Sequence, residues 1–159
     1  MVRSVLVAIH IAAGLGGLAA GLATLAPPAP SDERRWVRQI YLACILTLFV
    51  SLVGMIAVDW AGLDVAARFT FSALAVLAAV MIYRLARARG EASTREAGWK
   101  ERYINHVAFS YIALWEGFVI LPALNLPLPQ VSVPVVAIGV LGIGHTLIGR
   151  YKARVAPSW

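Results

Sequence analysis

The chain is poor in charged residues and nearly free of cysteine. Of its 159 residues, 14% are charged and 60% are hydrophobic, whereas soluble globular proteins carry about 25% charged residues. A soluble domain of this length would need more polar surface to cover its core, so the composition indicates a membrane protein. The single cysteine, Cys44, lies in an apolar stretch, and its being alone excludes a disulfide within the chain.

The chain also lacks the short motifs of soluble-type catalysis. It contains no HExxH, CxxC, P-loop or GxSxG, and no GxGxxG that follows a strand. The sequence therefore names no catalytic residue and favours a protein that is not an enzyme. The net charge of +6 is better explained by basic cytoplasmic connections than by nucleic-acid binding, because no nucleic-acid motif is present.

Five apolar stretches are long enough to cross a bilayer, for which a helix needs about 20 residues. Their approximate bounds are 4–26, 38–60, 68–86, 103–124 and 131–150. Backbone polar groups inside a bilayer must be satisfied within each helix, so we predict an all-α integral membrane bundle of five helices. No other part is long enough for a second domain, and residues 1–159 are therefore predicted to form a single transmembrane domain.

Basic residues are concentrated in alternate connections between these stretches. They gather in segments 26–38 and 84–102 and in the tail after residue 149, whereas connections 60–67 and 125–130 contain none. The positive-inside rule places basic connections in the cytoplasm. The N-terminus is therefore predicted to lie outside and the C-terminus in the cytoplasm, in a multi-pass protein of the inner (plasma) membrane.

Four ionisable side chains lie well inside the predicted spans: His10, His106, Glu116 and His145, with Asn105 beside His106. Such groups are costly in lipid and usually face the interior of a bundle. At 1.5 Å per residue, His10 and Glu116 have similar depths near the outer surface, and His106 and His145 have similar depths near the inner surface. The sequence thus offers two depth-matched pairs.

Two interpretations of the histidines stay open. In the first, His106 and His145 ligate haem b from facing helices, and this is the one cofactor for which the residues argue. In the second, each histidine forms a hydrogen bond with a neighbouring helix. The pair His10 and Glu116, with Asn105, would instead bind a small ligand or take part in proton transfer.

Small residues follow one face of the first span and one face of the fifth. In the first span these residues, together with His10, are Ala13, Gly14, Gly17, Gly21 and Thr24. In the fifth span, the residues that share a face are Gly139, Gly142, His145 and Gly149. Small residues at this spacing let helices approach closely in lipid, so we expect the face of the first span to meet protein.

Three short motifs resemble those of a family of small polytopic bacterial membrane proteins of unknown function. The HI-x-x-G motif of the family's first helix is matched by His10, Ile11 and Gly14. The segments RRWVRQIY (34–41) and EAGWKER (96–102) resemble the family's HRW-x-G-R-x-Y and HRRWM-x-R motifs.

The two later segments keep only part of the family's motifs. They keep Arg35, Trp36 and Tyr41 in the first and Trp99 and Arg102 in the second. The family's histidines are replaced by Arg34 and Glu96. If those histidines carry the family's chemistry, this chain has lost it. The resemblance implies a bacterial polytopic architecture and no particular activity.

Three classes of function follow from these observations. The sequence favours a non-enzymatic accessory subunit or self-associating helical bundle, because the chain is small, carries small-residue faces and has almost no soluble part. Its partners would be the lipid bilayer and either another membrane protein or further copies of the chain. The alternatives are a b-type cytochrome-like electron-transfer protein with His106 and His145, and a carrier or binding pocket for a small or hydrophobic ligand around His10 and Glu116.

Overall fold

The computed structural model describes residues 1–26, 35–124 and 126–155. Over these ranges the chain forms five long α-helices and a short 3-10 helix, and it contains no strand. The helices are α1 (Val2–Leu25), α2 (Arg35–Asp59), the 3-10 helix η2 (Trp60–Gly62), α3 (Val65–Thr94), α4 (Trp99–Ala123) and α5 (Pro129–Val155). The predicted all-helical fold is confirmed.

All five helices are long enough and apolar enough to cross a membrane. The helix α3 is longer than the span predicted within it and continues to Thr94. Its last turns are rich in alanine and arginine, which favour helix. The helix stops at Arg95, which adopts a left-handed conformation with φ of 52° and donates its backbone N–H to the carbonyl oxygen of Glu91 at 3.1 Å.

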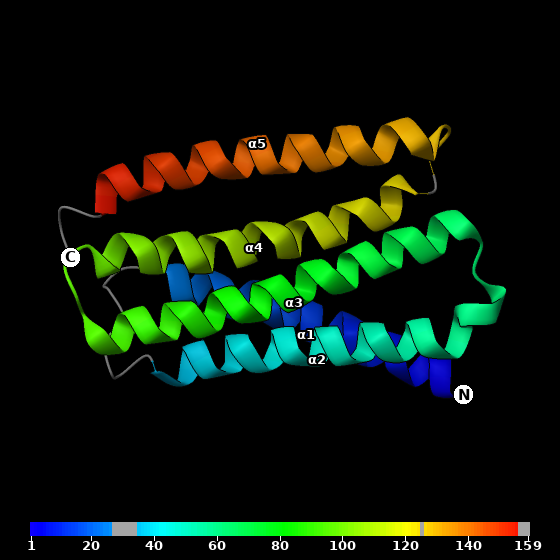
Figure 1. The fold of residues 1–159 in the computed structure, drawn as a ribbon, viewed down its shortest axis with the longest axis horizontal. Helices are drawn as coiled ribbons and strands as arrows, with labels where there is room; N and C mark the ends of the chain where they lie inside the picture. The colour runs from blue at the N-terminus through cyan, green and yellow to red at the C-terminus, as the bar shows by residue number, and fades with distance from the viewer. Residues whose placement is uncertain (27–34, 125, 156–159) are drawn as a thin grey trace.

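The helices run alternately up and down along one common direction (Figure 1). The helix α4 occupies the centre, with α1, α3 and α5 packed against it, while α2 packs against α1 and α3. The helix α5 lies along one side of the bundle and packs mainly against α4. As a result, α1 begins at one end of the bundle and α5 ends at the other.

The core is built around α4. In the most apolar 18-residue stretch of α4, 44% of the residues are buried. In the corresponding stretch of α5, none of the residues is buried. The largest fully buried side chains are Tyr41, Tyr103, Ile45, Ile104, Val107 and Ser110. Within this core the hydroxyl of Tyr41 donates to Oγ of Ser110 at 3.3 Å, which satisfies a polar group between α2 and α4.

The glycine face of α1 is filled by neighbouring helices, as the sequence predicts. A methyl group at Gly21 would lie 2.6 Å from Cδ2 of Tyr111 and 3.0 Å from Cε2 of Tyr41. A methyl group at Gly14 would lie 2.7 Å from Cζ of Phe118. These contacts are closer than van der Waals distance, so glycine allows α2 and α4 to approach the backbone of α1.

The glycines of α5 differ among themselves. A methyl group at Gly144 would lie 2.7 Å from Cγ1 of Ile112, so this glycine permits the close contact between α5 and α4. At Gly139, Gly142 and Gly149 the same methyl group would meet nothing within 4 Å. The part of the chain that the structure describes therefore leaves this face of α5 uncovered.

Candidate functional site

The imidazole of His10 is bound to α2. Its Nδ1 lies 2.9 Å from Oγ of Ser51, and the Ser51 hydroxyl donates to the carbonyl oxygen of Leu48 at 3.0 Å. Ser51 therefore links the His10 side chain of α1 to the backbone of α2.

Glu116 lies on α4 and is 9% exposed. Among the described residues it makes no hydrogen bond or ion pair, and Ser51 is the polar partner of His10. The structure thus does not join His10 to Glu116, although the two residues have similar predicted depths. The reason is geometric, since His10 faces α2 at this level.

A pocket of about 290 Å³ opens beside His10. Two of its lining residues, Arg3 and Asp59, form an ion pair in which Nε and Oδ2 lie 3.0 Å apart. Its remaining walls are mainly apolar and come from α1, α2, the segment after η2, α3 and α4. Glu116 does not line it. A cavity therefore lies beside His10, but Glu116 is not part of its wall, and ligand binding around these two residues stays a prediction.

His106 and His145 are not brought together. His106 is partly buried, and its Nδ1 has no hydrogen-bond partner among the described residues. The charged groups that act on it include Arg84 and Glu91 of α3. His145 is exposed on α5. The two histidines therefore lie in different surroundings, one beside α3 and the other on the outside of the bundle.

The register between α4 and α5 also separates these histidines along the helix axis. Nζ of Lys152 donates to Oδ1 of Asn105 at 2.8 Å, and Gly144 packs against Ile112. His106 is therefore level with residue 151, and His145 lies six residues, or about 9 Å, away at 1.5 Å per residue. A bis-histidine haem requires two imidazoles facing each other across the iron, so this arrangement does not fit one.

No group of three or more metal-ligating side chains occurs within the described ranges. Asn105, expected near a ligand, instead joins Lys152, which also lies 3.5 Å from Oε1 of Glu101. Asn105 and Glu101 therefore attach the end of α5 to the start of α4.

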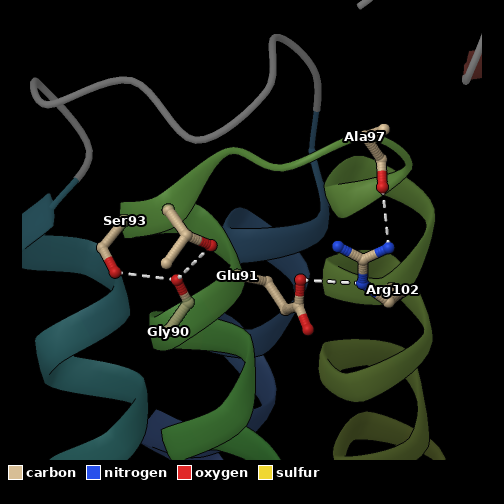
Figure 2. A network of polar contacts seen from close by, with 6 residues as sticks. Gly90, Glu91, Ser93, Ala97 and Arg102 are labelled. Atoms are coloured by element: carbon tan, nitrogen blue, oxygen red, sulfur yellow. Dashed lines mark hydrogen bonds and ion pairs between the residues drawn. The ribbon is translucent and has the colours of Figure 1, made fainter.

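The turn between α3 and α4 is held by a polar network (Figure 2). Nε of Arg102 donates to Oε2 of Glu91 at 2.8 Å, and another nitrogen of the same guanidinium donates to the carbonyl oxygen of Ala97 at 2.8 Å. The hydroxyl of Ser93 donates to the carbonyl oxygen of Gly90 at 2.7 Å. Gly98 provides the left-handed residue, with φ of 75°, from which α4 begins.

A polar pocket of about 280 Å³ lies at this same end of the bundle. Four helices, α1 to α4, contribute to its wall. Its polar lining residues are Thr24, Arg35, Arg38, Gln39, Tyr41, Arg89, Ser93 and Tyr103. Sequence reasoning missed this pocket, because it assigned the arginines separately to two connections. The only signal available was that both connections were predicted to lie on the same side of the membrane.

No protein-family model, curated protein or solved structure matches this chain. The resemblance to small bacterial membrane proteins therefore stays a prediction. What the protein does is therefore inferred from the geometry of the chain itself.

Proposed function

We propose that this chain is a multi-pass protein of a bacterial inner membrane, with its N-terminus outside and its C-terminus in the cytoplasm. Large apolar side chains are exposed on the sides of the bundle, as on Val50 (65%), Phe69 (79%) and Ile138 (70%). Lipid would cover such residues. The described basic residues from Arg84 to Arg102 and from Arg150 to Arg154 lie near one end of the bundle, which would face the cytoplasm under the positive-inside rule.

Within that membrane, we propose that the protein is a non-enzymatic bundle that associates with a second copy of itself through α5. The observation that carries this proposal is the uncovered outer face of α5. This face is formed by Val135, Gly139, Gly142, Thr146, Gly149 and Ala153, all of which are exposed. They recur at steps of three and four, so they lie in one row along the helix.

The row has the composition that favours close packing of helices in lipid. Three of its members are glycines with nothing within 4 Å of an added methyl group. Small residues allow backbones to approach, and the resulting dispersion contacts drive association where the hydrophobic effect does not operate. A two-fold dimer places identical faces against each other. A row of small residues is compatible with such self-pairing, because neither copy presents a bulky side chain.

Cysteine cross-linking in membranes tests this contact. In a Cys44→Ala background, Thr146→Cys should form a disulfide-linked dimer under mild oxidation, because Thr146 lies at the centre of the row. Adding Gly142→Leu should reduce the dimer about tenfold, since a large side chain would hold the backbones apart. Gly90→Leu is the matched control, because a methyl group at Gly90 also meets nothing within 4 Å.

The outcome distinguishes self-association from an accessory role. A dimer band that Gly142→Leu leaves at full strength would overturn the α5 contact. A chain that never cross-links to itself but co-purifies with a larger membrane protein, and loses that protein through Gly142→Leu, would show the accessory subunit instead.

A further inference from the structure

The polar pocket between the ends of α1, α2, α3 and α4 is a second candidate site, and it is separate from the α5 face. Residues distant in sequence converge on it: Thr24 ends α1, Arg35 and Arg38 begin α2, Arg89 lies near the end of α3, and Tyr103 lies in the first turns of α4. The pocket is therefore a product of the folded bundle and does not belong to any single connection.

The charge of its wall has one sign. Arg35, Arg38 and Arg89 line the pocket, and no carboxylate does so in the part of the chain that the structure describes. Arg35 and Arg89 are exposed, so water reaches their guanidinium groups. The like charges of Arg35 and Arg89 on the wall of one small cavity repel one another. An anion placed between them would remove this repulsion.

Tyr103 adds a second, independent observation. Its side chain lines the pocket and is 1% exposed. Its hydroxyl oxygen is buried and has no hydrogen-bond partner among the described residues. A buried hydroxyl without a partner costs free energy, and Tyr41, the other tyrosine in the wall, does have a partner in Ser110. The unused donor of Tyr103 is thus a specific gap in the polar network of this pocket.

We infer that this pocket binds a phosphate-bearing anion. Guanidinium groups bind phosphate oxygens through paired N–H donors, and the Tyr103 hydroxyl would donate to a further oxygen. A cavity of about 280 Å³ accommodates an inorganic phosphate or pyrophosphate, or the headgroup of an anionic phospholipid. Both sources share the chemistry that the wall recognises. On the proposed topology, the pocket opens at the cytoplasmic side.

The test measures thermal unfolding of the detergent-purified full chain with two probes. One probe is inorganic pyrophosphate, added at constant ionic strength against sodium chloride. The other is short-chain phosphatidylglycerol, added against the matched phosphatidylcholine. We expect at least one anionic probe to raise the unfolding midpoint, because a ligand that binds only the folded state stabilises it. Failure of both to do so would overturn the inference.

Arginine variants connect the effect to the pocket. Arg35→Gln and Arg89→Gln should each weaken binding of the active probe about tenfold, as expected for loss of a charged hydrogen bond. Arg87→Gln removes the same charge from an exposed position on α3 that does not line the pocket and should change binding less than twofold. Equal losses in Arg87→Gln and Arg89→Gln would show general charge attraction and overturn the site.

Tyr103→Phe separates binding from folding. Because the hydroxyl has no partner, its removal should leave the unfolding midpoint of the ligand-free protein unchanged or raise it. The same variant should weaken binding about fivefold, since a ligand oxygen loses its donor. Unchanged binding would remove Tyr103 from the site and contradict the inferred geometry.

The two probes distinguish the sources of the phosphate. Stabilisation by pyrophosphate alone identifies a soluble phosphate ligand, and stabilisation by phosphatidylglycerol alone identifies a lipid headgroup. Either result supports the site, provided that Arg35→Gln and Arg89→Gln each weaken binding of that probe about tenfold. Cross-linking through α5 is measured independently of anion binding. Failure of the dimer proposal would therefore not affect the phosphate site, and failure of the phosphate site would not affect the dimer proposal.

Discussion

Two helices of this bundle carry several glycines along one face, and the structure uses them differently. In α1, Gly14, Gly17 and Gly21 lie against side chains of α2 and α4. In α5, Gly139, Gly142 and Gly149 lie against nothing in the described chain. The comparison teaches that glycine spacing predicts a surface suited to close packing, whereas the identity of the partner depends on where the helix lies in the bundle.

The largest loss of stability is expected where a substitution disrupts the packing of the α1 glycines. Gly21→Leu places its side chain where Tyr111 and Tyr41 already lie, at 2.6 and 3.0 Å from the position of the new Cβ. Tyr41 is 1% exposed, so the new side chain would collide with a buried ring. We expect a loss of about 3 kcal/mol in the free energy of unfolding, measured by denaturation in detergent. A variant as stable as the wild type would mean that α1 does not pack in this way.

A smaller effect on stability is expected at His10, which shares a face of α1 with these glycines. Ser51→Ala removes the hydrogen-bond partner of Nδ1 of His10. The expected cost is about 1 kcal/mol in the free energy of unfolding. His145→Ala on α5 is the control, since His145 is exposed, and it should change stability by less than about 0.5 kcal/mol. Equal effects of the two variants would contradict the contrast between the helices.

The smallest expected effects are changes in stability of opposite sign in α5 and α1. Gly139→Ala adds a methyl group in open space, and alanine favours helix over glycine, so we expect the monomer to gain about 0.5 kcal/mol. Gly14→Ala makes the same chemical change 2.7 Å from Cζ of Phe118 and should reduce stability. Thermal unfolding of both variants at a dilution that favours monomers gives the two signs. A gain at Gly14 would refute tight packing there.

The sequence was sufficient to predict the helices and the packed face of α1, because helix length, apolarity and small-residue spacing are local properties. It did not predict the partner of His10. Ser51 and Glu116 were both available on neighbouring helices, and the rotation of one helix relative to another depends on packing along its whole length. The periodicity of apolar and small residues along one helix contains no information about that rotation.

The relative position of His106 and His145 could not be read from the sequence for a related reason. Their depths were estimated from the ends of apolar stretches, whereas the relative position of α4 and α5 is determined by Gly144 on Ile112 and by Lys152 on Asn105. The polar pocket lined by Arg35 and Arg89 was missed because these residues become neighbours only after four helices have assembled.

The distribution of buried residues has a consequence for how the protein is made. Every buried residue in the described part of the chain belongs to α1, α2, α3 or α4, and the hydroxyl of Tyr151 on α5 donates to the carbonyl oxygen of Leu25 on α1. Because a chain emerges from the ribosome N-terminus first, the four-helix core can close before α5 has been synthesised. The fifth helix then joins a finished surface, and Tyr151 links the last part of the chain to its first helix.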